Sequence, residues 1–234
     1  QWIPEAEQGR AELMGYTVVN PLSVLSTHLT EIVRGYAPDL LNRQMVQEML
    51  NQLKSRSPAS VEGVVPEILS LSEFQTVLRN LLRERVPIRD LSGILEVVAN
   101  NATVTRDPNI LAEAVRQTMS HTLSSLYRDT ENTLHVFTLS PQLESTLRSS
   151  LGVSDSGVGF QIDASLAQII LRNTGEKMET LAGLGHMPIL LCPRELRMAF
   201  KRLVEQSLTN LVVLAYSEIS PGTKVKAHGM VEMN

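Results

Sequence analysis

Cysteine is almost missing from this sequence of 234 residues, which contains Cys192 alone. A single thiol excludes an internal disulfide and fits a reducing cytosol, because structural disulfides belong largely to oxidising compartments. Aromatic residues make up only 4% of the chain, so the core must consist mainly of aliphatic side chains. This composition favours helices packed on helices or on a sheet over an aromatic-rich β-sandwich.

A strong excess of charge and a long apolar run are also missing. The net charge is −4, and the basic residues are interspersed with acidic ones, which argues against a nucleic-acid partner. No apolar run approaches the ~20 residues that cross a bilayer. The chain begins QWIPEAEQ, without an initiator methionine or a signal peptide. We therefore expect an excised part of a longer protein, whose remainder could contain membrane spans.

Motifs for catalysis and metal binding are absent. No histidine stands in HExxH or at a zinc-ligand spacing, so we predict solvated or capping roles for them and no metal. The histidines are His28, His121, His135, His186 and His228. Cys192 ends a predicted buried strand without an identifiable base, which favours a core residue over a nucleophile. Gly157 and Gly159 precede a predicted strand and lack the third glycine of a phosphate loop, which favours a mobile turn.

Two pairs of carboxylates are the remaining candidates for acid–base chemistry. Glu73 with Glu84, and Asp90 with Glu96, lie among arginines on predicted helix surfaces, so we interpret them as solvated ion pairs. The sequence thus predicts no catalytic residue, no cofactor and no enzymatic activity. A small-molecule enzyme built on the C-terminal part is an alternative, and it predicts a deep polar pocket with a shifted titratable pair.

Helical periodicity dominates the first half of the chain. Asn20 and Pro21 predict the start of a helix, and Pro38 predicts its end. The apolar face of this helix consists of Leu22, Leu25, Leu29, Ile32 and Val33. Ser72 with Gln75 predicts a capping box at the start of a later helix.

Beyond residue 134, short strands alternate with helices, which indicates a largely buried sheet. The predicted fold class is α+β with several subdomains. An all-α helical subdomain is followed by a small α/β subdomain with a mixed sheet.

Two groups of residues suggest contact surfaces. Thr27 and His28 interrupt the apolar face of their helix, and they form one wall of a shallow binding groove unless Thr27 simply bonds back to its own helix. Arg85, Arg89 and Asp90 crowd around a helix break. They form either a solvated corner or a set of directional charge pairs at an inter-subunit contact.

Several collinear segments resemble one known family. They are WIPEAEQGRAELMGYTVVNPLSVLSTHLTEIVR, NRQMVQEMLNQL, VPEILSL, VLRNLLRERVPIRDLSGILE and PILLCPRELRMAFKRLVEQSLTNLVVLAYSEI, and together they span about residues 2–219. These segments resemble the cytosolic region of the flagellar type III export gate proteins, the FHIPEP family, whose paralogues serve virulence injectisomes. Local departures from the family pattern occur at Asn42, at Ser92 with Gly93, and at Thr209.

The resemblance implies a role in protein export. Members of the family are anchored by an N-terminal membrane part, and their cytosolic region forms a nine-subunit ring at the cytoplasmic face of the bacterial inner membrane. There they receive export chaperone–substrate complexes and contact other export proteins, including the soluble ATPase complex. THLTEIV and VPIRDL favour the flagellar branch, and the same role in an injectisome is the alternative.

The resemblance also implies subdomain boundaries. Residues 1–40 would hold the end of a truncated second subdomain and a helix of the first. Residues 41–123 would form the helical third subdomain, residues 124–133 a linker, and residues 134–234 the α/β fourth subdomain.

Single residues follow from the resemblance as well. Thr27 matches a threonine of the chaperone-binding groove, whose aspartate and phenylalanine would lie before Gln1. A face of the third subdomain near Arg85, Arg89 and Asp90 is expected to contact a neighbouring subunit of the ring.

Overall fold

The computed structural model describes residues 2–154 and 157–233. Its helices are α1 Gln8–Leu13, α2 Pro21–Leu40, α3 Arg43–Arg56, α4 Leu71–Arg83, α5 Leu91–Ala102, α6 Pro108–Thr118, α7 Ser120–Tyr127, α8 Pro141–Ser149, α9 Ala164–Gly183 and α10 Arg194–Val204. Its strands are β1 Thr133–Leu139, β2 Leu151–Ser154, β3 Gly157–Phe160, β4 Ile189–Cys192, β5 Val212–Ala215 and β6 Lys224–Val231. Short 3₁₀ helices are η1 Glu5–Glu7, η2 Pro58–Ser60 and η3 Tyr216–Glu218.

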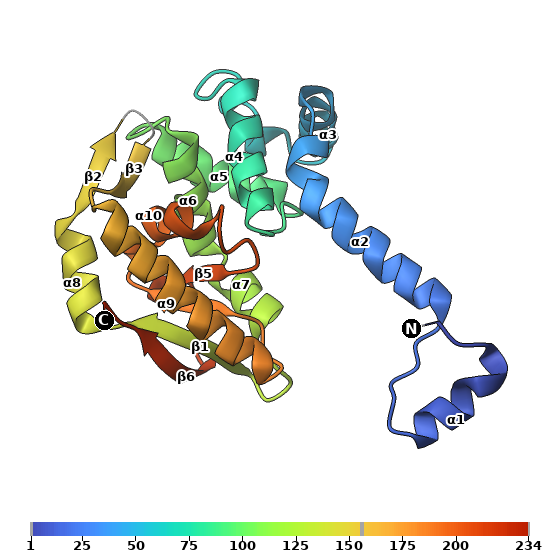
Figure 1. Ribbon diagram of the computed structural model, residues 1–234. Coiled ribbons are helices and arrows are strands. Elements are labelled where there is room, and N and C mark those ends of the chain that lie inside the picture. The colour runs from blue at the N-terminus through green and yellow to red at the C-terminus, as the bar shows by residue number, and fades with distance from the viewer. Residues whose placement is uncertain (1, 155–156, 234) are drawn as a thin grey trace.

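Helices α3 to α7 pack around one aliphatic core (Figure 1). The central helix α4 fully buries an apolar stripe of Phe74, Val77, Leu78 and Leu81. Burying each such side chain stabilises the fold by about 1.5–3 kcal/mol. These side chains hold α4 between α3 and α6 and fix the position of its C-terminal end.

The capping box of α4 lies two residues before the predicted one. The Ser70 hydroxyl accepts a hydrogen bond from the Glu73 backbone N–H, and the Glu73 carboxylate accepts one from the Ser70 backbone N–H. Ser72 is therefore inside the helix. The Gln75 side chain donates instead to the Leu41 carbonyl oxygen at 2.8 Å, and this bond ties α4 to the end of α2.

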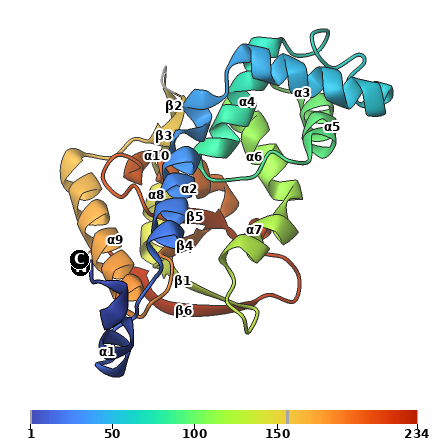
Figure 2. The same ribbon diagram turned by 90° about the vertical axis from the view of Figure 1, so that its right-hand side faces the viewer.

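The second half of the chain forms a sheet in the strand order β5-β4-β1-β6. Helices α8, α9 and α10 pack on one face, while Tyr127 of α7 and Ile219 next to η3 pack on the other (Figure 2). The predicted α+β fold class is confirmed. The mixed character of the sheet needs correction, because every pair in it is parallel. Antiparallel pairing occurs in the separate hairpin of β2 and β3. Helical crossovers such as α10 between β4 and β5 impose the parallel arrangement.

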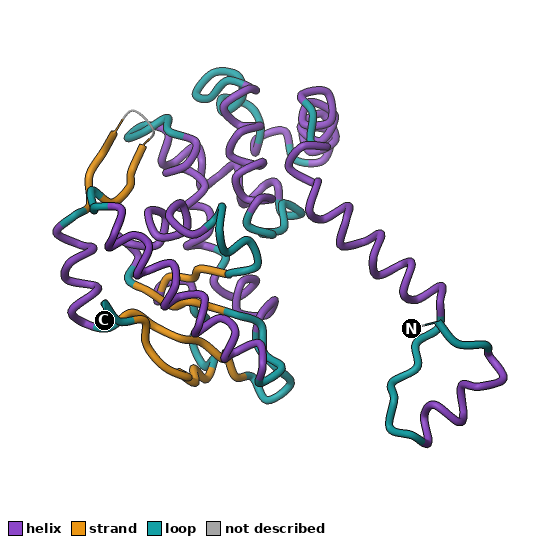
Figure 3. Tube along the Cα trace, viewed as in Figure 1, coloured by secondary structure: helices purple, strands orange, loops and turns teal. Residues whose placement is uncertain are grey.

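Helix α2 projects from the rest of the molecule, and α1 lies beyond its N-terminal end (Figures 1 and 3). It starts at the predicted Asn20 cap, whose side chain accepts from the Leu22 N–H at 2.8 Å. It continues past Pro38 to Leu40, because a proline in the last turn leaves the later bond from the Leu41 N–H to the Ala37 carbonyl intact.

The predicted linker over residues 124–133 overlaps the last turn of α7, and residues 128–132 then turn into β1.

Among residues 2–154 and 157–233, no helix combines the length and apolar composition needed to cross a lipid bilayer.

Candidate functional site

Thr27 lies exposed on the projecting part of α2. The apolar residues predicted to form one face of this helix are exposed too, with Leu22 at 71% and Leu29 at 62%. Globular proteins rarely leave a contiguous apolar face of this kind without a partner. Thr27 is on the same exposed helix, but it points about 140–160° away from Leu22 and Leu29 because the helix turns once every 3.6 residues.

Arg85 occupies the turn after α4. Its φ of 58° lies in the left-handed region, and the turn is closed by hydrogen bonds from the Arg85 N–H to the Leu82 carbonyl and from the Val86 N–H to the Leu81 carbonyl. The side chain reaches α2 and pairs with Glu31 at 3.2 Å. This predicted contact residue thus already has a partner within its own chain.

Arg89 and Asp90 lie at the start of α5, where both are exposed. The Asp90 carboxylate caps the helix by accepting from the Gly93 N–H at 3.1 Å. A Cβ at Gly93 would lie 2.5 Å from that carboxylate, so glycine makes room for the cap. Arg89 borders a shallow cavity of about 380 Å³ between α3 and α5 and remains available for an external contact.

A buried ion-pair network joins the two halves of the chain. Arg197 of α10 binds Glu84 at the end of α4 with both terminal nitrogens, at 2.6 and 2.9 Å, and it also binds Glu113 of α6. Arg116 of α6 binds Glu218 of η3 at 2.7 and 3.1 Å and approaches Glu84 at 3.3 Å. Both arginines are almost completely buried, at 1–2% exposure. Bidentate pairs of this kind also fix the relative orientation of the elements that carry them.

The charges in this network shift the pKa values of its members. Burial alone would raise the pKa of Glu84, but Arg116 and Arg197 outweigh burial and lower it to about 2. Burial raises the pKa of Glu113 in spite of Arg197, and burial lowers the pKa of Lys201 nearby. The interpretation of Glu84 as a solvated surface carboxylate is therefore wrong. Glu73, by contrast, is a capping residue.

A cleft of about 920 Å³ lies over this network, between α2, the α4–α5 turn and the sheet. Its walls include Glu31 and Arg34 of α2, and Glu84, Arg116 and Lys201. Thr27 lies one helical turn before Glu31, so it is on the side of α2 that borders this cleft. The polar pocket and shifted groups that an enzyme would require are thus present. However, Glu84 is engaged by two guanidinium groups, and structural ion pairs also shift pKa values.

Three of the histidines for which the sequence predicts solvated or capping roles lie next to one another in the fold. His135, His186 and His228 each offer a ring nitrogen within 4.8 Å of the others, although they are far apart in the sequence. Burial, followed by the neighbouring His135, lowers the pKa of His228. No local spacing signals this cluster, because its members come from two strands and a turn that meet only in the folded sheet. His28 and His121 are exposed, as predicted.

The remaining candidates, Cys192 and the two glycines of the GxG sequence, belong to the core and to a strand. Cys192 is fully buried and burial raises the pKa of its thiol, as the core interpretation expects. Gly157 and Gly159 lie within β3 and pair with β2, so they belong to a strand rather than to a turn before one. Residues 155 and 156 between these strands are outside the described residues.

Comparisons with known proteins agree with this architecture. The solved structure of Chlamydia pneumoniae CdsV matches with a TM-score of 0.88 and 22% identity, over 99% of this chain and 66% of CdsV. The cryo-EM structure of nonameric EPEC SctV-C matches with a TM-score of 0.82 and 23% identity, over 97% of this chain and 68% of that one. The fold is therefore the one adopted by cytosolic domains of type III export gate proteins.

Sequence comparison narrows this class to one family. A family model described as FHIPEP matches residues 1–224. The flagellar biosynthesis protein FlhA of Bacillus subtilis is 33% identical over 233 residues, which are 100% of this chain and 34% of that protein. The chain belongs to the FHIPEP family, as the resemblance of its motifs predicted. It spans about a third of the length of this relative.

Proposed function

We propose that the chain is a docking and ring-forming part of the bacterial flagellar type III protein export apparatus, where it receives chaperone–substrate complexes. The match to the FHIPEP family over residues 1–224 carries this proposal. The flagellar branch is favoured because relatives at 31–34% identity are named flagellar biosynthesis proteins.

The surface around Thr27 on α2 is the proposed docking site for the chaperone. The side of α2 that carries Thr27 borders a cleft lined by charged side chains, and the opposite side of the same helix carries exposed apolar residues. Amphipathic chaperone helices or extended segments can bury apolar side chains on such a face while charged groups at the rim set the orientation.

Ring formation is proposed to use the corner at Arg89 and Asp90. Arg89 is exposed beside a shallow cavity, and the name of SctV-C describes that protein as nonameric. Anchoring of the full protein at the cytoplasmic face of the inner membrane would raise the local concentration of subunits. The family resemblance adds the soluble ATPase complex to the proposed partners.

The docking proposal is tested by measuring the affinity of purified flagellar chaperone–substrate complexes for the full-length protein that carries this chain. Thr27→Met places a bulky side chain on the proposed surface, and we expect binding to weaken at least tenfold, or by about 1.4 kcal/mol. Thr103→Met makes the same substitution at an exposed position after α5 that does not line the cleft, and it serves as the control.

Equal binding by wild type and Thr27→Met, or equal loss in both variants, would contradict the docking surface. Absence of binding by the wild-type protein would contradict the flagellar role. Binding of injectisome chaperone–effector complexes in its place would support the alternative branch.

A further inference from the structure

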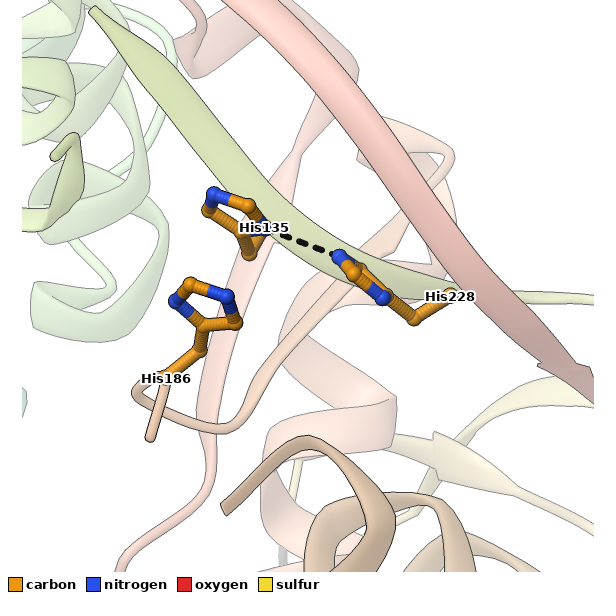
Figure 4. A group of neighbouring side chains, drawn as sticks. All are labelled: His135, His186 and His228. Carbon is orange, nitrogen blue, oxygen red and sulfur yellow. Dashed lines mark hydrogen bonds between the residues drawn. The ribbon is translucent and has the colours of Figure 1, made fainter. Parts of the chain in front are cut away.

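His135, His186 and His228 point toward one another on the face of the sheet that α9 covers (Figure 4). His135 comes from β1 and His228 from the neighbouring strand β6. His186 follows α9 directly, in the turn that leads into β4. Each is half-buried, so solvent and small ions can reach the three rings.

His228 lies at an irregularity in β6. Val136 pairs with Ala227, whereas Thr138 pairs with Met230, so β6 contains one extra residue relative to β1. Gly229 lies at this bulge with a φ of 141°, a conformation that glycine alone adopts readily. Because the bulge resets the alternation, His228 and the buried Val231 both face α9. Bulges are frequent where a strand must redirect a side chain at a functional position.

A carboxylate orients the central ring. Asp129 Oδ2 lies 3.0 Å from His135 Nε2, while its Oδ1 accepts hydrogen bonds from the Glu131 and Thr133 backbone N–H groups at 2.9 and 2.8 Å. The charged carboxylate holds the proton of His135 on Nε2 and leaves the lone pair of Nδ1 directed at His228 Nε2, 2.8 Å away. A carboxylate bonded to the distal nitrogen of a histidine is a common companion of metal ligands.

The spacing of the nitrogens fits a small divalent ion. In a tetrahedral zinc site with Zn–N bonds of 2.0–2.1 Å, the ligand nitrogens lie about 3.3 Å apart. The three available nitrogens here lie within 4.8 Å of one another, so they need to move by about 1.5 Å or less. His135 and His186 are stacked at a centroid distance of 3.5 Å. The His186 ring must therefore turn, which its position in a turn after Gly185 permits.

We propose that His135, His186 and His228 form a binding site for a divalent transition metal ion of the zinc class. Nδ1 of His135 and Nε2 of His228 supply two ligands, a ring nitrogen of His186 supplies the third, and water completes a four-coordinate sphere. Imidazole ligands favour Zn²⁺, Cu²⁺ and Ni²⁺ over Mg²⁺ and Ca²⁺.

Binding would cross-link the edge strand β6, the inner strand β1 and the turn before β4. The ligands are neutral, Asp129 is the nearby carboxylate, and Lys177 and Lys226 add positive charge close to the site. We therefore expect micromolar rather than nanomolar affinity for Zn²⁺.

The test titrates untagged, chelator-treated protein with Zn²⁺ by calorimetry and with Co²⁺ by visible absorption. We expect one ion per chain, a four-coordinate Co²⁺ spectrum and a higher Tm in the presence of Zn²⁺. His186→Gln should weaken binding more than tenfold while leaving the sheet intact, since this side chain lies in a turn. Asp129→Asn should weaken binding by about tenfold through the orientation of His135.

His121→Gln is the matched control, because His121 is exposed on α7 and away from the cluster. Its affinity should equal that of wild type, and circular dichroism confirms the fold of each variant. The proposal is overturned if wild type binds no Zn²⁺ at micromolar concentrations. It is also overturned if folded His186→Gln binds as tightly as wild type, or if His121→Gln loses binding to the same extent.

Discussion

Glu84 connects elements that are distant in the sequence. It ends α4, yet its carboxylate is bound by Arg197 of α10 and approached by Arg116 of α6. Because the carboxylate sits among buried guanidinium groups, its removal leaves positive charge uncompensated in a low-dielectric interior.

Substitution Glu84→Gln should reduce the free energy of unfolding at pH 7 by about 3 kcal/mol. The folded-state pKa of Glu84, about 2, lies below the ordinary value of 4.5. The stabilisation is therefore complete above pH 4.5 and is lost as the pH falls toward 2. Urea unfolding of both proteins across this range should show their difference narrowing with falling pH.

Glu96→Gln is the control for this measurement, since Glu96 is exposed on α5 and its loss should change stability by less than about 0.5 kcal/mol. A constant difference between wild type and Glu84→Gln from pH 7 to pH 3 would contradict the lowered pKa.

Residue roles were the hardest property to predict from the sequence. Asp90 and Asn20 act locally as caps, so their environment is visible in a few neighbouring letters. In the sequence, Glu84 stands between arginines, as exposed glutamates on helix surfaces also do. Only the folded structure, which brings Arg116 of α6 and Arg197 of α10 to its carboxylate, separates it from those exposed residues. The histidine cluster was missed for the same reason, because sheet pairing rather than sequence spacing assembles it.

At the scale of elements, α2 is held to α4 near its C-terminal end. Arg79 Nε donates to the Pro38 carbonyl oxygen at 2.6 Å, and the same side chain pairs with Asp39 at 3.3 Å. The adjacent Pro38 is buried. The half-buried guanidinium of Arg79, within α4, thus contributes strongly to the attachment of α2.

Arg79→Ala should loosen this attachment without unfolding the helical core. A hydrogen bond to a charged group is worth about 1.5–3 kcal/mol, so amide exchange over residues 37–41 should accelerate by about tenfold or more. Hydrogen–deuterium exchange with mass spectrometry measures this rate. Arg83→Ala, one turn further along α4, removes a bond to Asn80 of its own helix and should leave exchange in α2 unchanged.

Several elements could be predicted closely and others could not. The start of α2 could be predicted at the correct residue, because the Asn20 cap before Pro21 acts over a single turn. The end of α2 and the capping box of α4 were misplaced by two residues, since a late proline and a neighbouring serine leave the local pattern ambiguous. Strand β6 is parallel to β1 because the chain crosses from β5, at one edge of the sheet, to the opposite edge before β6 begins. No local sequence pattern encodes this crossing.

At the scale of the whole molecule, the proposed ring depends on contacts between copies of the chain. Arg89→Glu in the full-length protein should reduce ring assembly, observed by native electrophoresis of membrane extracts, and should reduce flagellar export. Charge reversal converts a directional pair into a repulsion, which costs several kcal/mol across an interface.

Arg106→Glu changes an exposed arginine elsewhere in the helical region and should preserve both assembly and export. Normal assembly and export in the Arg89→Glu protein would remove this corner from the ring contact.

The projection of α2 has a mechanical consequence. With 20 residues, the helix is about 30 Å long, and Thr27 lies about 16 Å along the axis from Pro38. A tilt of about 10° at the Arg79 attachment would displace Thr27 by about 3 Å, as a lever converts a small rotation into a larger translation. Breaking or forming the ion pair between Glu31 and Arg85 is therefore a means of opening or narrowing the cleft, and Thr27 moves about half as far again as Glu31 because it lies one turn further from the attachment.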